Sequence, residues 1–412
     1  MDELTYKEVA VEEIHHVASL CRRSFKHFVQ EFWEEVPGAG KLIWNWHLDV
    51  ICDELQTVAE RVFAGEPRLY DLVINISPGT SKSSLVSILF PAWTWTRMPS
   101  ARHLSSSHTE TLVLDLASKA RSVIISDKYR ECYPEVRIRH DQDTKGYYAN
   151  TLGGDRIACT VGGESPMGFH AHFLSGDDLL DPKKAVSEAE VRNARDFLTT
   201  ILPSRKVDKR VSVTILVMQR LKSDDPTAVM LEVSRREGGS PVRHICLPAE
   251  LADNVKPEEL RERYIDGVMD PVRLGKEVLR EARAVLGSYG FAGQYQQNPV
   301  PLGGGMFKET YFQQKVKAAP YASRRVRFWD RAATEGGGCF TAGVLLAKDS
   351  NGSYYVEDVV HGQWEPDERD ERILMTARKD KARYGPRYDP TVYIEQEPGS
   401  SGVDAYKYTA RK

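Results

Sequence analysis

The sequence predicts an α/β protein in which a domain with a mostly parallel sheet is followed by a second, β-rich domain. Short apolar runs alternate with helical patterns between residues 72 and 218, which is the order typical of a parallel sheet. The stretch 298–307, NPVPLGGGMF, combines two prolines with three consecutive glycines and marks a domain boundary. Beyond it, β-like segments follow one another directly, which favours an antiparallel meander.

Composition limits the class of protein. A chain of 412 residues is expected to hold about two to three domains. No apolar stretch approaches the length of a membrane span, and the acidic start does not resemble an export signal, so we expect a cytoplasmic protein. The six cysteines are scattered, which predicts neither a disulfide framework nor a zinc cluster. The net charge of -3 leaves a nucleic-acid partner open.

The first domain opens with helical patterns and then shows a candidate phosphate-binding loop. Residues 8–35 and 41–65 carry apolar positions at helical spacing. In the second pattern, Trp44, Trp46 and His47 form either a base-stacking platform or, more simply, part of the core. The buried strand 72–76 then leads into a turn and a further apolar segment expected to be helical over 85–95.

The chemistry of this turn explains its residue types. Backbone N–H groups at a helix start bind phosphate oxygens, a Lys neutralises their charge, and a Ser hydroxyl binds Mg2+. Ser81 stands where the common pattern has Gly, and a simple polar turn is the alternative interpretation. The expected nucleotide-binding residues are Ser77, Pro78, Gly79, Thr80, Ser81, Lys82, Ser83 and Ser84.

Two later strands of the first domain end in polar residues. A short strand ends in Asp177 and Asp178, and paired acids downstream of a phosphate loop suit Mg2+-dependent hydrolysis of a nucleoside triphosphate. A turn or helix cap is the alternative. The strand 211–218 ends in Gln219 and Arg220, which either sense the γ-phosphate or form a polar edge loop. The proline-broken segment from about 222 to 280 is expected to be a small subdomain packed on the sheet.

In the second domain, Asp330 ends one strand and Glu395 and Glu397 end another, after a helix expected over 367–384. Acids from separate strands that converge on two divalent metals are typical of ribonuclease H-like nucleases. Exposed acids at strand ends are the alternative. Basic stretches at 205–210 and 323–327 are candidate DNA contacts or solvated loops.

Taken together, these motifs resemble the large terminase subunit of tailed bacteriophages over nearly the whole chain. The resemblance rests on SPGTSKSS as a variant phosphate loop, SGDDLLDPKKAVS as the Walker B region and VMQRLKSDDP as the coupling segment. FAGQYQQNPVPLGGGMF is similar to the connection between ATPase and nuclease, and FWDRAATEGGG and YIEQEPGSSG resemble the first two nuclease motifs. The motifs follow one another in the family's order.

The resemblance implies a fold and the roles of individual residues. We expect an ASCE-type P-loop NTPase over 1–300, with a lid or linker subdomain at about 222–300, and a ribonuclease H-like domain over 306–412. Lys82 would bind the β- and γ-phosphates, and Ser83 and Asp177 would hold Mg2+. Asp178 would be the general base and Gln219 the coupling residue. The nuclease metals, Mg2+ or Mn2+, would be held by Asp330 and Glu395, with Glu397 as the alternative to Glu395.

The resemblance also implies a biological role. We expect an ATP-driven motor that moves double-stranded DNA into a procapsid in the cytoplasm of the bacterial host. Its expected partners are a small terminase subunit and a portal protein, on which the motor would form a homo-oligomeric ring, with no membrane involved. The alternative is a helicase-like remodelling ATPase with a non-catalytic β-rich binding module.

Three residues or segments depart from the family's pattern. Asp178 stands where relatives commonly have Glu, Cys339 stands where many have an acid, and the sequence ends before the late helix or strand that carries the family's third nuclease carboxylate. We therefore expect an incomplete nuclease domain and leave open whether it is active in this form.

Overall fold

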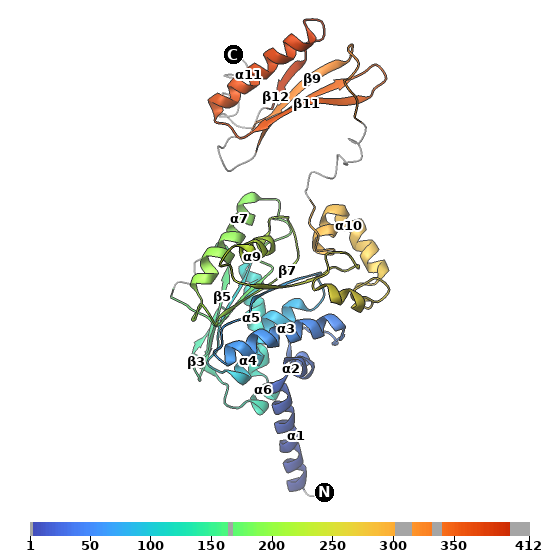
Figure 1. Cartoon of the computed structure of the whole chain (residues 1–412). Coiled ribbons are helices and arrows are strands. Elements are labelled where there is room, and N and C mark those ends of the chain that lie inside the picture. Colours follow the sequence, from blue (N-terminus) through green and yellow to red (C-terminus); the bar gives the residue numbers. More distant parts are fainter. Residues whose placement is uncertain (1–2, 164–167, 301–314, 332–339, 396–412) are drawn as a thin grey trace. The chain divides into compact units, whose positions relative to one another are not determined.

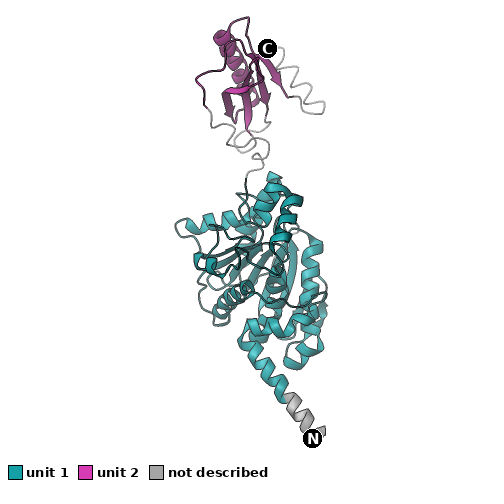
Figure 2. Ribbon diagram, turned by 90° about the vertical axis from the view of Figure 1, so that its right-hand side faces the viewer, with its two compact units in different colours: residues 1–307 teal, residues 308–412 magenta. Residues whose placement is uncertain are grey.

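The computed structural model of the protein describes residues 3–163, 168–300, 315–331 and 340–395. The chain divides into two compact units, Met1–Phe307 and Lys308–Lys412 (Figure 2). The division falls at the end of the proline- and glycine-rich stretch 298–307, and each unit is described here by itself. Within the described ranges, no helix is both long enough and apolar enough to cross a bilayer.

Unit 1 is built on an eight-stranded sheet with the strand order β3-β4-β5-β2-β6-β7-β1-β8. Neighbouring strands are parallel from β5 across to β8, whereas β3, β4 and β5 pair antiparallel. This confirms the predicted α/β class with a mostly parallel sheet. The strands are β1 (Asp71–Ile76), β2 (Arg102–Ser107), β3 (Ile138–Asp143), β4 (Tyr147–Asn150), β5 (Asp155–Thr160), β6 (Phe173–Asp177), β7 (Val213–Met218) and β8 (Val242–Leu247).

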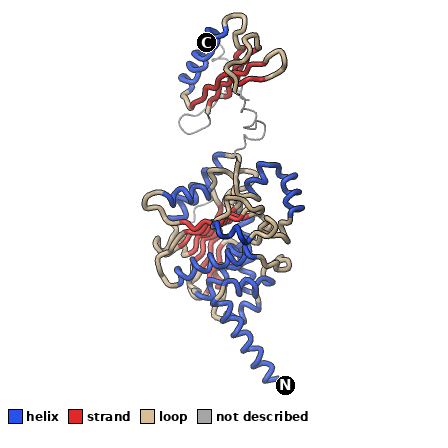
Figure 3. The backbone as a smooth tube through the Cα atoms, turned by 45° about the vertical axis from the view of Figure 1, so that its right-hand side comes forward, coloured by secondary structure: helices blue, strands red, loops and turns tan. Residues whose placement is uncertain are grey.

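Strands β1 and β7 form the centre of this sheet. Every residue of both strands is buried, because helices pack around the sheet (Figures 1 and 3). A strand covered on both faces needs apolar side chains at successive positions rather than at alternate ones. This is why β1 and β7 appear in the sequence as nearly continuous apolar runs.

Strand β8 differs from the expectation for the segment 222–280. We expected a small subdomain there, but β8 adds to the main sheet beside β1, in parallel register from Asp71↔Val242 to Ile76↔Leu247. The first half of β8, Val242 to His244, is only partly buried. Its mixed sequence, VRHICL, therefore lacks the apolar pattern of a central strand.

The helices of unit 1 largely follow the predicted positions. Several begin at polar caps: Ser24, Thr109 and Asp225 each accept a backbone N–H from the first turn. The helices are α1 (Glu3–Arg23), α2 (Phe25–Phe32), α3 (Trp46–Phe63), α4 (Phe90–Arg97), α5 (Glu110–Ile125), α6 (Asp127–Cys132), α7 (Glu188–Asp196), α8 (Leu202–Ser204), α9 (Pro226–Arg235) and α10 (Lys276–Gln294), with the shorter turns η1 (Trp33–Glu35), η2 (Ser84–Leu89), η3 (Phe197–Ile201) and η4 (Glu258–Arg263).

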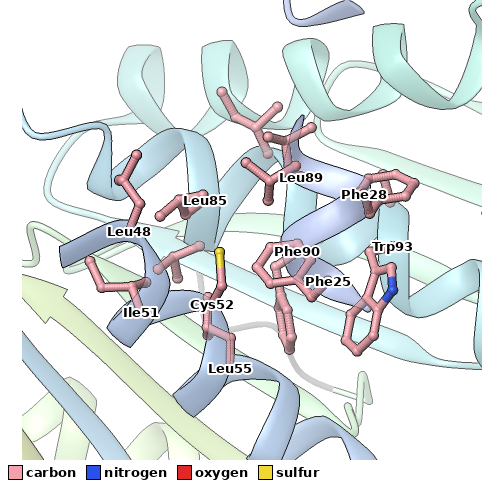
Figure 4. Close-up of a cluster of buried hydrophobic side chains, with 14 of the residues drawn as sticks. Phe25, Phe28, Leu48, Ile51, Cys52, Leu55, Leu85, Leu89, Phe90 and Trp93 are labelled. Atoms are coloured by element: carbon pink, nitrogen blue, oxygen red, sulfur yellow. The ribbon is translucent and has the colours of Figure 1, made fainter. Parts of the chain in front are cut away.

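The main core of unit 1 joins α2 and α3 to the helix that follows β1. Phe25 lies against Phe90 and Trp93, with ring centroids 5.6 and 5.1 Å apart (Figure 4). Leu85 and Leu89 belong to the same cluster and are fully buried. This packing fixes the helix that begins at Lys82, so the end of β1 is held in place by a large apolar contact.

Unit 2 contains a four-stranded sheet with the order β11-β10-β9-β12 and one long helix. β9 (Arg324–Asp330), β10 (Thr341–Lys348) and β11 (Tyr354–Gly362) form the predicted antiparallel meander. Helix α11 (Pro366–Tyr384) follows, and β12 (Thr391–Ile394) pairs parallel with β9. Strands β9 and β12 therefore end at the same edge of this sheet.

Candidate functional site

The loop after β1 has the backbone of a tight strand-to-helix turn. Gly79 and Ser81 both adopt positive φ, 75° and 65°. Thr80 Oγ1 donates to the carbonyl of Ser77 at 2.8 Å, and the helix begins at Lys82. The backbone amides at this helix start are the donors that phosphate oxygens require. The residues predicted for the loop thus form a turn able to bind an anion.

Lys82 meets both predicted carboxylates at the edge of the sheet. Its ammonium group donates to Asp178 and lies 3.8 Å from Asp177 Oδ1. Strands β1 and β6 are both parallel to β7, which separates them, so their carboxyl ends reach the same edge. Asp177 ends β6, and Asp178 follows with a φ of 45°. A non-glycine residue with positive φ is typical of functional sites.

Both carboxylate oxygens of Asp177 accept hydrogen bonds from hydroxyl groups of the helix after the loop. Ser83 Oγ donates to Oδ1 at 3.0 Å, and Ser87 Oγ donates to Oδ2 at 2.6 Å. Sequence reasoning identified Ser83 but missed Ser87. The available signal was the spacing of four residues, which places two serines on one helix face. The π-helical turn η2 could not be predicted from the residue pattern.

Burial and charge change the pKa values within this cluster. Burial lowers the pKa of Lys82, but the negative charges of Asp178 and Asp177 outweigh it, so the pKa lies above its usual range. Burial raises the pKa of Asp177, an effect that the nearby Lys82 partly offsets. The group is therefore a buried, charge-paired cluster in which the lysine stays positively charged.

The oxygen atoms of Ser83 and Asp177 fit a magnesium ion. Mg2+ is typically held in nucleotide sites by one or two protein oxygens together with substrate phosphates and water. A hydroxyl and a carboxylate that already touch, at 3.0 Å, satisfy this requirement without a larger ligand set. Among the described residues, no group of three or more His, Cys, Asp or Glu could hold a metal ion.

Gln219 lies next to Asp178, directly after β7. Its backbone N–H donates to Asp178 Oδ1 at 3.3 Å. The side chain is 8% exposed, and its Oε1 is buried with no hydrogen-bond partner among the described residues. An unsatisfied buried amide oxygen is costly. Gln219 thus contacts Asp178 through its backbone N–H, and its side-chain Oε1 is an acceptor that a ligand or water could bind.

Of the three aromatic residues before the loop, Trp46 and His47 are buried in the core, as the simpler interpretation held, and Trp44 is partly buried against it. Trp46 Nε1 donates to the carbonyl of Met269 at 3.0 Å, and the side chain is buried. His47 is fully buried, and its Nε2 lies 3.2 Å from the carbonyl oxygen of Thr80. Burial and the charge of Arg273 lower the pKa of His47 to about 4. A neutral His47 therefore contacts the backbone of the loop at Thr80.

In unit 2, the sheet places Asp330 and Glu395 at adjacent strand ends. Trp329 pairs with Ile394 in parallel register, and the N–H of Glu395 donates to the carbonyl of Trp329 at 2.9 Å. Asp330 and Glu395 are the next residues of the two strands and are both exposed. Glu397 and Cys339 lie outside the described residues.

The two basic stretches proposed for DNA contact contain three side chains that are buried in ion pairs, whereas Lys209, Arg210 and Arg324 are exposed. Lys206 lies 3.0 Å from Asp71 and is 7% exposed. In unit 2, Arg325 pairs with Glu357 at 2.7 Å, and Arg327 is completely buried against acidic groups of β11 and α11. These three side chains support the fold, so their assignment as DNA contacts was wrong. A run of basic letters does not reveal acids that lie far away in the sequence.

The comparisons with known proteins found similarity to solved structures alone. No protein-family model matches the sequence, and no curated protein matches it either. The chain is similar to the crystal structure of the HK97 bacteriophage large terminase, with 12% identity, a TM-score of 0.43, and coverage of 91% of this chain and 74% of that chain.

Two further solved structures are similar in the same range. The large terminase of a thermophilic bacteriophage matches with 12% identity and a TM-score of 0.37, over 87% of this chain and 80% of that chain. The ATPase domain of a Thermus phage large terminase matches with 12% identity and a TM-score of 0.36, over 56% of this chain and 88% of that chain.

Proposed function

We propose that unit 1 is a P-loop ATPase of the ASCE type. The observation that supports this most directly is the meeting of Lys82, Ser83, Asp177 and Asp178 at one edge of a parallel sheet. A lysine, a hydroxyl and two acids next to a helix start are the groups that hydrolysis of a nucleoside triphosphate requires. The strand order, with β1 between β7 and β8, supports the same assignment.

The contacts suggest how each side chain would act. The loop amides and Lys82 would bind the phosphates, and Ser83 with Asp177 would hold Mg2+, which would supply positive charge against the phosphates. In the nucleotide-free contacts, Asp178 accepts a hydrogen bond from Lys82. Binding of phosphates to Lys82 would release Asp178, which could then orient or deprotonate the attacking water.

Gln219 is the candidate coupling residue. Its N–H already contacts Asp178, and the next residue, Arg220, donates its backbone N–H to Gln297 Oε1 at 3.0 Å. Gln297 lies just beyond α10, at the end of unit 1. Release of Asp178 would thus change the contacts of Gln219 and, through Arg220, those of Gln297 in the segment that follows α10.

We further propose that this ATPase is the motor of a phage large terminase, which moves double-stranded DNA into a procapsid. The order of the sequence motifs supports this proposal. A small terminase subunit, a portal protein and a ring of identical subunits would be its partners. Unit 2 would be the ribonuclease H-like endonuclease that cuts concatemeric DNA, with Asp330 and Glu395 binding Mg2+ or Mn2+.

A helicase-like remodelling ATPase with a non-catalytic second unit is the competing proposal. One observation favours it: among the described residues of unit 2, no group of three or more His, Cys, Asp or Glu could hold a metal ion. Both proposals share the ATPase, and they differ in whether unit 2 cleaves DNA.

Substitution of Lys82 or Asp177 by Ala tests the shared ATPase. Loss of either charge from the site should lower Mg2+-dependent ATP turnover by roughly a hundredfold or more. The control is Lys119→Ala, which removes a lysine that pairs with Asp115 on the surface helix α5. Wild-type turnover in both site variants, with folding verified by circular dichroism, would refute the proposal.

A further inference from the structure

The phosphate loop contains a residue with a strained backbone, Ser81, directly before Lys82. Ser81 has a φ of 65°, in the left-handed region that glycine enters freely and that residues with a Cβ atom disfavour. It directly precedes Lys82, and its carbonyl accepts the N–H of Leu85 at 3.1 Å, which begins the helix. The conformation of Ser81 thus decides where the loop amides and Lys82 point.

Arg273 reaches this position from a segment 192 residues further along the chain. Its Nη1 donates to Ser81 Oγ at 2.9 Å, and its Nη2 donates to the carbonyl of Ile43 at 2.6 Å. Its Nε lies 2.7 Å from Asp270 Oδ2, and the arginine side chain is 16% exposed. One planar guanidinium group therefore connects the loop to two other segments.

The turn that carries Arg273 is itself held in place. Asp270 is fully buried, and its Oδ1 accepts the N–H groups of Val272 and Arg273 at 3.2 Å each. The carbonyl of Met269 accepts hydrogen bonds from Asn45 and Trp46. These contacts fix the direction in which the guanidinium group approaches Ser81, so Arg273 can act as a rigid support.

We propose that Arg273 is a positioning residue that holds Ser81 in its left-handed conformation and thereby takes over the part that glycine plays in the common loop. The Ser81 hydroxyl, which a glycine lacks, accepts a hydrogen bond from the Arg273 guanidinium group. This hydrogen bond favours the left-handed conformation of Ser81 over its other backbone conformations. The inference rests on the proposed ATPase for its effect on nucleotide binding. Its effect on the loop itself does not depend on ATP.

A double-mutant cycle tests this inference in the full chain. Arg273→Ala should raise both the Kd for Mg2+-ATP, measured by calorimetry, and the KM of turnover by roughly tenfold. The Kd of Ser81→Gly alone is the reference against which the double variant is compared. In the double variant, the glycine should restore most of the lost affinity, because it adopts positive φ without support.

Arg261→Ala is the matched control. Arg261 lies in the same region and also contacts a carbonyl and a carboxylate, those of Ala252 at 2.9 Å and Asp253 at 3.1 Å, but these partners do not belong to the loop. Its removal should leave the Kd for Mg2+-ATP unchanged. A weakening equal to that of Arg273→Ala would overturn a specific role for Arg273.

The remaining outcomes separate the inference from the proposed function. If Arg273→Ala binds ATP weakly and the added Ser81→Gly does not restore the affinity, the inference is overturned. That result would indicate that Arg273 contacts the nucleotide directly or that its loss lowers the stability of unit 1. A wild-type protein that binds no ATP would refute the ATPase proposal. Hydrogen exchange of the backbone amides of residues 77–84, measured without nucleotide, tests the positioning itself. The exchange rate should increase in Arg273→Ala and return to the wild-type rate in the double variant. An unchanged rate in Arg273→Ala would overturn the inference.

Discussion

Asp177 and Asp225 are both buried, and burial raises the pKa of both carboxyl groups. Because the folded-state pKa lies above the unfolded value of about 3.9, the contribution of each group to stability is fully present below that value and is lost as pH rises through the folded-state pKa. At neutral pH, each buried negative charge is therefore a cost that its partners must offset.

The partners of the two aspartates predict opposite effects of removing the charge. Asp177→Asn should leave stability at pH 7 equal or higher, because Lys82 keeps its ion pair with Asp178, while ATP turnover is lost. Asp225→Asn should cost about 3 kcal/mol, because Arg220 is left without its carboxylate at 2.8 Å. Urea unfolding measures both. Equal destabilisation by the two variants would contradict the separation of a functional charge from a structural one.

At the scale of elements, the contact between α10 and the segment after β7 is unusually close. A Cβ atom on Gly293 would lie 2.7 Å from the backbone carbonyl oxygen of Arg220. Tyr289, on the same helix, donates its hydroxyl to the carbonyl of Leu221 at 3.3 Å. The segment that contacts Asp178 is thus packed directly on the last helix of unit 1.

Gly293→Ala should therefore destabilise unit 1 by about 1–3 kcal/mol, because α10 must move away from a backbone atom. Gly290→Ala is the control on the same helix, where the nearest atom is a side-chain carbon of Leu286 at 3.1 Å. It should be neutral or slightly stabilising, since Ala favours a helix more than Gly does. Chemical unfolding measures both variants, and a neutral Gly293→Ala would argue against tight packing here.

The pairing of β8 with β1 contains a buried polar network that responds to pH. His244 Nε2 lies 2.8 Å from Asn75 Oδ1, and Asn75 Nδ2 donates to Met218 and Thr227. The oxygen of Asn75 is thus an acceptor, and His244 Nε2 carries the proton. Burial, with the charge of Arg220 as a further cause, lowers the pKa of His244 to about 4.

Stability of unit 1 should fall as pH decreases below 6.5. In the unfolded chain, His244 has a pKa of about 6.5, whereas in the folded protein its pKa is lowered to about 4. The stabilisation from His244 is therefore fully present above pH 6.5 and is lost as the pH falls toward 4. We expect His244 to account for about 2 kcal/mol between pH 7.5 and 5. The same urea measurement on His244→Asn should show a correspondingly weaker pH dependence, and an unchanged one would exclude His244 as the cause.

At the scale of the whole molecule, the two units hold separate candidate sites. Lys82 and its partners belong to unit 1, whereas Asp330 and Glu395 end neighbouring strands of unit 2. If unit 2 is a nuclease, supercoiled plasmid should be nicked in the presence of Mn2+. Asp330→Ala should abolish the nicking because a carboxylate metal ligand is removed. ATP turnover should persist in that variant.

Lys82→Ala is the reciprocal control for the nicking assay. It removes a charge from the proposed ATPase and should leave Mn2+-dependent nicking intact. Nicking that survives Asp330→Ala would assign cleavage to other residues or to a contaminant. Complete absence of nicking by the wild type would favour the remodelling ATPase whose second unit binds without cutting.

Much of the architecture was predictable because it depends on local patterns. The apolar runs of β1 and β7 and the helix after Asp367 follow periodicity, and the loop residues follow the chemistry of phosphate binding. The polar residues Ser105, Ser106 and Ser107 do not suggest a buried strand, yet they lie within β2 and are buried. There, Ser106 Oγ donates to the carbonyl of Ser175 at 2.8 Å. Hydroxyls that find such a partner can lie inside a sheet, which composition alone does not show.

Local sequence was enough to predict the α/β class, the strand-to-helix loop at residues 77–84 and the pair of acids at the end of β6, because each depends on residues close together in the chain. Only the tertiary structure decided that Ser87 holds Asp177 across 90 residues and that Arg273 holds Ser81 across 192. The same holds for β8 beside β1 and for the burial of Lys206. Such contacts depend on strand order and side-chain packing, which bring distant residues together and leave no periodic signal in the sequence.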